Sequence, residues 1–169
     1  MLQHPIGTTP APGTRLDGSL FGPQNRCFAC SPDHPTGLRL KFHVEGDEVV
    51  TNFVPARAHE GAPGVMHGGL VTTVADEVGV WALIALLGKF GFTGTMNSRF
   101  PRPVRCEREV QGRATITNKS TRIVQAQIRM VQDGADCFTS TMSFILLNQK
   151  GAETMIGAPL PEGWKKYFR

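Results

Sequence analysis

The stretch that decides the fold runs from His67 to Leu87 and reads HGGLVTTVADEVGVWALIALL. Its apolar residues do not keep to one stripe at helical spacing but go most of the way round a helix. A helix that is apolar on nearly every side is surrounded by protein. The residue that follows, Gly88, suits the left-handed position just after a helix end. We therefore predict one long helix, buried in the middle of the domain.

Alternation of apolar and polar residues on both sides of this helix predicts antiparallel strands. Upstream, 38–44 and 48–54 form a predicted hairpin that turns at Gly46 and Asp47, followed by a loop over 55–64. Downstream, strands are expected over 93–100, 107–117, 124–130 and 137–147. A curved antiparallel sheet of five to six strands can bury a single helix all round while its other face is half solvated. This order of elements is the α+β hotdog arrangement.

Length and composition fit one globular domain. The 169 residues are 40% hydrophobic and 19% charged, enough for one core and short for two. Residues 1–25 are rich in Pro and Gly without any period, so we expect a flexible arm there and a single hotdog domain over 26–169. The longest apolar stretch, 78–87, is about half of what a membrane span needs. The N-terminus lacks the basic start and apolar core of a secretory signal. We expect a cytoplasmic protein that does not enter a membrane.

Charge and cysteine content narrow the partners. A net charge of +4 and a pI near 9.1 describe a mildly basic chain, with basic residues mostly scattered. A nucleic-acid binder more often clusters them among aromatic residues, so no nucleic acid is expected. A phosphate-bearing small molecule such as coenzyme A suits this balance, as does surface charge kept for solubility.

The four cysteines are expected to be reduced thiols, because the chain is larger than the small domains that depend on disulfides. Two of them, Cys27 and Cys30, have the spacing of half a zinc site. No second pair at ligand spacing follows, and His34 and His43 do not supply one. We therefore expect no metal and no cofactor.

Two features of the long helix point to chemistry. Gly68 and Gly69 leave bare backbone amides at the positive end of the helix dipole, a position that binds phosphate or stabilises an oxyanion. Asp76 is a carboxylate in an otherwise apolar helix, so its pKa should rise unless donors compensate. Thr72 and Thr73, four and three residues before it, share its face and are expected to supply those donors.

Three segments together resemble one family. His67-Gly68-Gly69 followed by Asp76 looks like the signature of hotdog thioesterases of the phenylacetate-pathway (PaaI-like) type. Upstream, CFAC-SPDHPTGLRLKF (27–42) resembles the segment before their first strand. Downstream, TGTMNSRFPRP (93–103) resembles the strand that ends in an Arg-Pro pair. The resemblance covers roughly residues 26–147 and implies a hotdog acyl-CoA thioesterase.

The resemblance also implies roles for particular residues. Asp76 matches the acid that attacks the thioester or activates water. Gly68 matches the glycine whose amide polarises the thioester carbonyl, and His67 a histidine that helps to position it. Thr93 falls where members carry a Ser or Thr that holds the water or assists the carboxylate. Glu77 is the rival for the catalytic carboxylate, but its offset from His67 does not match.

The pattern departs from the family at one place. The family's Asn or Gln about six residues before the histidine is missing, because Gly61 and Ala62 stand there. His59 or Glu60 is the candidate substitute for that second polarising contact.

Contacts to the substrate are expected from six further residues. Arg99 and Arg102 can meet the phosphates of coenzyme A, although solvated charge at a strand edge is the alternative reading. The complete set is Gly69, Thr72, Thr73, Asn97, Arg99 and Arg102.

A length argument predicts at least a dimer. Eight residues of helix separate Gly68 from Asp76, which is about 12 Å. A thioester carbon must lie within about 3–3.5 Å of its nucleophile and its oxygen within hydrogen-bonding distance of its donor. One helix cannot do both, so the amide of one subunit should face the carboxylate of another across an isologous interface.

Other functions are compatible with the same pattern. A hotdog dehydratase or hydratase would use a differently placed acid–base pair, and a non-catalytic module would bind acyl-CoA unchanged. Nucleic-acid binding has only the pI in its favour. The sequence does not indicate the acyl group, nor the choice between a dimer and a tetramer.

Overall fold

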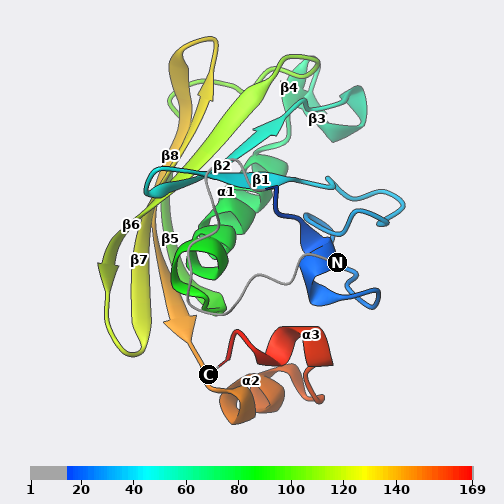
Figure 1. Cartoon of the computed structure of the whole chain (residues 1–169). Helices are drawn as coiled ribbons and strands as arrows, with labels where there is room; N and C mark the ends of the chain where they lie inside the picture. The colour runs from blue at the N-terminus through cyan, green and yellow to red at the C-terminus, as the bar shows by residue number, and fades with distance from the viewer. Residues whose placement is uncertain (1–14, 169) are drawn as a thin grey trace.

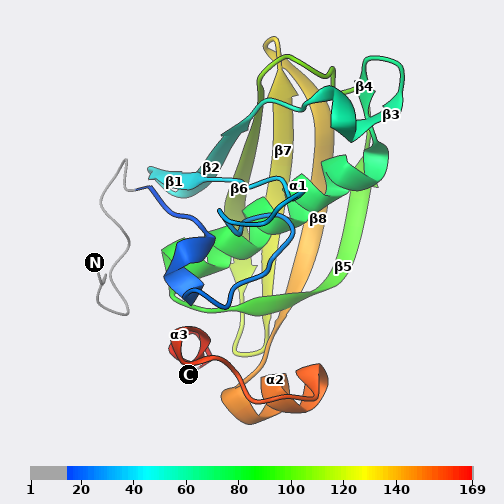
Figure 2. The ribbon, with the colours of Figure 1, turned by 90° about the vertical axis from the view of Figure 1, so that its right-hand side faces the viewer.

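A six-stranded antiparallel sheet wraps around one long helix. The computed structural model describes residues 15–168. Helix α1 (Gly68–Ala82) lies across the concave face of the sheet (Figures 1 and 2). In sheet order the strands are β1 (Phe42–Glu45), β2 (Glu48–Phe53), β6 (Val110–Lys119), β7 (Ile123–Gln132), β8 (Ala135–Leu146) and β5 (Gly91–Arg99). The predicted hotdog fold, with its single central helix, is confirmed.

The central helix is as deeply buried as its composition predicts. Val74, Val78 and Trp81 have no exposed surface. A π-helical turn, Leu83–Leu87, continues α1 and ends at Gly88, whose φ of 63° is the left-handed conformation expected there. Gly68–Leu87 is long and apolar enough by composition to cross a membrane. Here the sheet covers it, and it is the core helix of the domain.

The strands bury one side chain in two, as their alternation predicts. In β7, Ala126, Ile128 and Met130 face the helix and are fully buried. Their neighbours Gln125 and Gln127 are exposed on the opposite face.

Two local predictions around the first hairpin were wrong in detail. The strand expected over 38–44 begins only at Phe42, because Arg39 adopts a φ of 52° that interrupts the extended chain. The alternation was nevertheless a true packing signal, since Leu38 and Leu40 are buried. The segment expected to be a loop contains a 3-10 turn, Arg57–His59, and a small hairpin of β3 (Glu60–Ala62) and β4 (Val65–Met66).

The N-terminal segment is part of the domain from residue 15 onward. The expected arm, 1–25, lies outside the described residues up to 14, but the remainder is packed. Leu16 pairs with Phe42 in a β-bridge and is buried. A 3-10 turn, Gly18–Phe21, buries Phe21 against the core. The prediction of a loose arm is therefore wrong for 15–25, because two apolar residues in a Pro/Gly-rich segment sufficed to anchor it.

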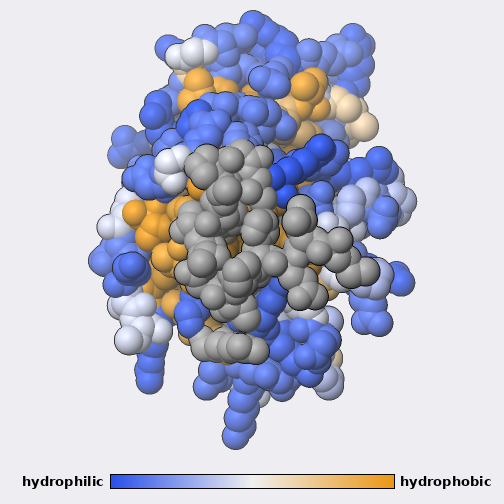
Figure 3. Space-filling view, viewed as in Figure 1, coloured by the Kyte–Doolittle hydropathy of each residue, from blue (hydrophilic) through white to orange (hydrophobic). Residues whose placement is uncertain are grey.

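Two short helices close one end of the domain. α2 (Gln149–Ile156) and α3 (Glu162–Lys165) follow the last strand, as the lower part of Figure 1 shows. Trp164 stacks on Phe21 with ring centroids 4.5 Å apart. The Phe90 amide donates to the Tyr167 carbonyl over 3.0 Å. The chain's two ends therefore meet beside the start of β5. The space-filling view shows polar residues over most of this face, with apolar residues in smaller areas (Figure 3).

Candidate active site

Asp76 lies at the middle of α1 and faces the first residues of β5. The Thr93 hydroxyl donates a hydrogen bond to its Oδ1. Burial raises the pKa of Asp76, and the Thr93 hydrogen bond acts in the opposite direction. The structure thus brings together two of the predicted catalytic residues, which are 17 positions apart in sequence.

A cavity of about 160 Å³ opens beside this pair. Its polar wall contains Asp76, Thr93 and Glu77, together with the two thiols of the N-terminal loop. The rest of the lining is mainly apolar and comes from four parts of the chain: Phe21, Val80, Ile84, Phe90, Phe92 and Trp164. A desolvated carboxylate at the edge of an apolar cavity is the environment expected for a catalytic acid group.

Glu77, the rival carboxylate, is engaged elsewhere. Its carboxylate accepts from Trp81 Nε1 at 3.0 Å and lies 3.6 and 3.7 Å from Cys27 Sγ. Burial raises the pKa of Glu77 to about 8, the largest of several contributions. The Cys27 thiol, by contrast, has its pKa lowered to about 6, chiefly by hydrogen bonding with Cys30. These contacts leave Asp76 as the carboxylate whose only side-chain donor among the described residues is Thr93.

The N-terminus of α1 presents bare amides, as predicted. His67 is the N-cap residue, and its Nδ1 accepts from the Gly69 amide at 3.0 Å. Gly68 is exposed and occupies the first helical position, where the amide has no partner within the helix. His67 is in turn held by the preceding turn, since its amide donates to the His59 carbonyl at 2.8 Å. This geometry gives His67 the role of orienting the terminus.

The prediction for Thr72 and Thr73 was wrong. Both hydroxyls donate to the Gly69 carbonyl, at 2.7 and 2.9 Å, instead of to Asp76. The cause is local, because a Thr hydroxyl in a helix readily bonds to the carbonyl three or four residues before it. The two threonines therefore fix the first turn of the helix and belong to its glycine end.

The predicted substrate contacts on β5 and beyond lie apart from the Asp76 cavity. Asn97 and Arg99 line a separate hollow of about 330 Å³ over β5, β7 and β8. Arg102 lines another, of about 520 Å³, with Arg129. Within one chain, these three residues are not brought together with Asp76.

The suggested substitutes for the missing amide residue are occupied or turned to solvent. The His59 Nδ1 accepts from the Ala56 amide at 3.0 Å. Glu60 is exposed in β3. A Cβ on Gly61 would lie 3.0 Å from the Cα of His67, so the family's larger side chain would not fit there without a shift.

Sequence reasoning missed most of the cavity wall. Phe21, Phe90 and Trp164 come from segments to which no role was assigned. The available signal was the density of aromatic residues at the two ends of the chain and at 90–92. The Cys-x-x-Cys segment was recognised, but nothing in the sequence indicated that it contacts Glu77.

One long helix inside a curved sheet, a carboxylate over an apolar cavity and a glycine-rich helix start define the class of hotdog-fold thioesterases. Residues 63–137 match the family model of the thioesterase superfamily. The chain belongs to that superfamily as a thioester hydrolase of the hotdog fold, similar to the phenylacetic acid degradation protein PaaI. A search of curated proteins found no significant match.

Solved structures of this class have similar folds. A thioesterase from Haemophilus influenzae is 26% identical, with 64% of this chain and 78% of that chain covered and a TM-score of 0.58. A phenylacetic acid degradation-related protein from Ralstonia eutropha JMP134 is 21% identical, with 69% and 92% covered and a TM-score of 0.61. A Streptococcus pneumoniae protein solved with coenzyme A is 14% identical, with 63% and 86% covered and a TM-score of 0.59. The chain spans 62% of another thioesterase superfamily protein, at 20% identity, 70% coverage of this chain and a TM-score of 0.65.

Proposed function

We propose that this protein hydrolyses an acyl-CoA, or a similar acyl-carrier thioester, to a free acid and a thiol, with Asp76 as the catalytic carboxylate. The observation that carries the proposal is the Asp76–Thr93 pair at the edge of an apolar cavity. The superfamily match supports thioester chemistry in general. The neighbour solved with coenzyme A supports that group as the thiol part of the substrate.

Asp76 can act in two ways at this position. Its carboxylate can add to the thioester carbon, which gives a mixed anhydride that water then hydrolyses. Alternatively it takes a proton from a water held by Thr93, and that water adds to the carbon. In both cases the tetrahedral intermediate expels sulfur as a thiolate, which takes up a proton from solvent. Thr93 keeps the reacting oxygen in place.

The oxyanion donor in this mechanism is the Gly68 amide of a second subunit. A Cβ on Gly68 would lie 3.9 Å from the Phe100 ring, which follows the end of β5, whereas Asp76 bonds to Thr93 near the start of that strand. Helix and strand therefore run in opposite directions. If two β5 strands pair antiparallel, the Phe100 end of one lies opposite the Thr93 end of the other. That arrangement moves Gly68 of one helix toward the partner's Asp76.

The outer edge of β5 supports this assembly. β5 is the terminal strand of the sheet, so one row of its backbone groups is unpaired within the described residues. Phe100 beside it is 52% exposed, which is unusual for a large aromatic side chain. Exposed strand edges are ready templates for pairing with another chain. A homodimer, or a tetramer built from it, would cover both features.

The cavity limits the acyl group. Its volume of about 160 Å³ is close to that of an engineered cavity of about 150 Å³ that takes up benzene. A short or single-ring acyl group fits such a space, whereas a long chain would need an exit toward the partner subunit. We therefore expect turnover to be fastest for short or aromatic acyl thioesters.

The test is release of free thiol from a panel of acetyl-, benzoyl- and palmitoyl-CoA. The variant Asp76→Asn should lower kcat by about 100- to 10,000-fold, the range for loss of a positioned acid–base group. The matched control is Asp47→Asn, a carboxylate in the exposed β1–β2 turn, which should leave kcat unchanged. Activity of Asp76→Asn within twofold of the native chain would reject the assignment. Consumption of an unsaturated acyl-CoA without thiol release would instead favour a hydratase.

A further inference from the structure

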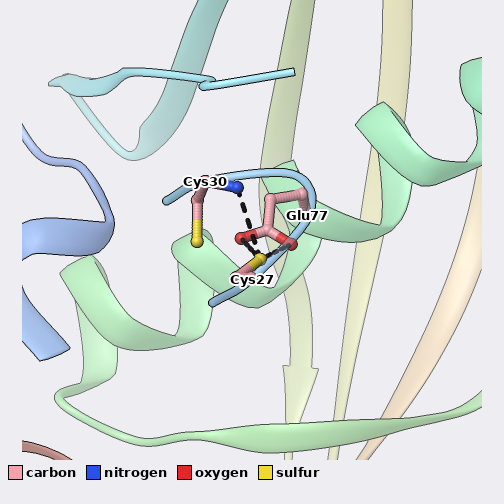
Figure 4. Close-up of side chains that lie close together, drawn as sticks. All are labelled: Cys27, Cys30 and Glu77. Atoms are coloured by element: carbon pink, nitrogen blue, oxygen red, sulfur yellow. Dashed lines mark hydrogen bonds between the residues drawn. The ribbon is translucent and has the colours of Figure 1, made fainter. Parts of the chain in front are cut away.

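Two cysteines and a glutamate meet beside the cavity in a way that the hydrolysis does not use. Cys27 and Cys30 lie on the loop before β1, and Glu77 projects toward them from α1 (Figure 4). One ligand atom from each residue lies within 4.8 Å of the other two. Cys30 is buried, and the other two residues are half-buried. All three line the cavity.

The cluster is chemically one-sided. It gathers two thiols and a carboxylate, all of which carry negative charge when ionised, and Asp76 is the next residue on the helix. No lysine, arginine or histidine is among the described residues that line the cavity. Buried acidic groups are normally paired with a cation or coordinate a metal. The partner missing from this set of side chains is a positive ion.

We propose that Cys27, Cys30 and Glu77 form a three-ligand site for a thiophilic divalent cation of the Zn²⁺ class. Two thiolates and one carboxylate oxygen are ligands that such an ion takes, and a Cys-x-x-Cys spacing is typical of its sites. The site goes beyond the proposed hydrolysis and does not depend on it.

The distances suit a tetrahedral ion. With bonds of about 2.3 Å to sulfur and 2.0–2.2 Å to oxygen, neighbouring ligand atoms lie about 3.5–3.8 Å apart. The Cys27 sulfur lies 3.6 and 3.7 Å from the two Glu77 oxygens. The Cys30 sulfur is within 4.8 Å of both partners, so a small side-chain rotation completes the triangle.

Outer hydrogen bonds already orient two of the ligands. The Cys30 amide donates to the Cys27 sulfur at 3.3 Å, and Trp81 Nε1 donates to Glu77 at 3.0 Å. Donors of this kind orient metal ligands and tune their affinity. A simple thiol–carboxylate hydrogen bond would account for Cys27 and Glu77, but not for the second sulfur on the same carboxylate.

Three protein ligands leave a fourth position of a tetrahedral ion open, as in sites where water or a small ligand completes the shell. Because the three residues line the cavity, that position faces the space beside Asp76 and Thr93. A bound ion would also tie the N-terminal loop to α1 and fix one wall of the cavity. The expectation of no metal considered only a second Cys or His pair, whereas this third ligand lies 50 residues from Cys27.

The experiment measures metal content, not turnover. The full chain, carrying a tag without histidines, is purified under reducing conditions and dialysed against Zn²⁺ at micromolar concentration. Elemental analysis should give about one Zn²⁺ per chain. Replacement by Co²⁺ should give sulfur-to-cobalt charge-transfer absorption. The variants Cys27→Ser, Cys30→Ser and Glu77→Gln should each weaken Zn²⁺ affinity by at least about tenfold.

Matched controls separate this site from non-specific thiol binding. Cys106→Ser and Cys137→Ser change buried thiols elsewhere and should leave stoichiometry and the cobalt spectrum unchanged. A chelator should lower the Tm of the native chain but not that of Glu77→Gln, a readout available even if a cysteine variant fails to fold. Less than about 0.1 Zn²⁺ per chain, or equal binding by Glu77→Gln and the native chain, overturns the proposal. So does a Cys27–Cys30 disulfide in a protein whose reduced form takes up no cation. Loss of thioesterase activity with the metal content intact would instead count against the hydrolytic assignment alone.

Discussion

Replacing Thr93 by Val removes the one hydroxyl that holds Asp76 and changes little else. Valine has the same branched shape and suits a strand, so β5 should be kept. A hydrogen bond to a charged group contributes about 1.5–3 kcal/mol. If it acts mainly in the transition state, each 1.36 kcal/mol lost is about tenfold in rate. We therefore expect kcat/KM of Thr93→Val to fall by about 10- to 150-fold, with thiol release from a short acyl-CoA as the assay.

Two companion variants make this result specific. Thr93→Ser keeps the hydroxyl and should retain most of the activity. Thr95→Val makes the same chemical change at the next exposed threonine of β5 and should behave like the native chain. A Thr93→Val enzyme within twofold of native kcat/KM, with unchanged Tm, would refute the claim that this hydrogen bond positions the catalytic carboxylate.

Two further changes probe the packing of the helix and the recognition of the thiol part. Gly79→Ala should destabilise the fold by about 1–3 kcal/mol, because its Cβ would lie 2.5 Å from Cζ of the buried Phe144. In thermal unfolding this lowers Tm by about 2–4 °C per kcal/mol, and a Tm at or above the native value would contradict that close approach. Arg102→Ala should raise KM for an acyl-CoA by about two- to fivefold, the loss expected for an exposed ion pair. KM for a short-thiol thioester without phosphates should not change, and an equal rise for both substrates would argue against a phosphate contact.

How far the sequence predicted the fold depended on how local each signal was. Residues from His67 to Gly88 gave the central helix because apolar side chains on all faces leave one solution. The alternation in β7 and β8 gave the buried face of the sheet. The sequence did not reveal the positive φ at Arg39, which shortens β1 without changing which side chains are buried.

The candidate site was predictable where a motif marked it. Asp76 and Thr93 were both named from the resemblance, and the structure places them in contact. The partners of Thr72 and Thr73 were assigned by helical spacing alone, which ignored the competing backbone carbonyl of Gly69. Contacts between distant segments, such as Trp164 on Phe21, follow from the complete packing of the domain. No local pattern contains them.

The central claim is that each active site takes its amide from one subunit and its carboxylate from another. Proline at Gly68 removes that amide with little cost to the helix, because Pro is favoured at the first helical position. The preceding residue already has a compatible ψ of 131° at His67. Gly68→Pro should therefore be folded and inactive. Gly68→Ala, which keeps the amide and has 3.9 Å to its nearest neighbour, should stay active.

The most direct measurement mixes two inactive chains. Gly68→Pro and Asp76→Asn are co-expressed in equal amounts, or are unfolded and refolded together, and thiol release is compared with that of each variant alone. In a mixed dimer one site receives both defects and the other receives none. With random pairing, half of the dimers are mixed and half of their sites are intact. The shared-site arrangement predicts recovery of about a quarter of native activity. No recovery above the separate variants, in a mixture shown to contain mixed dimers, would contradict it.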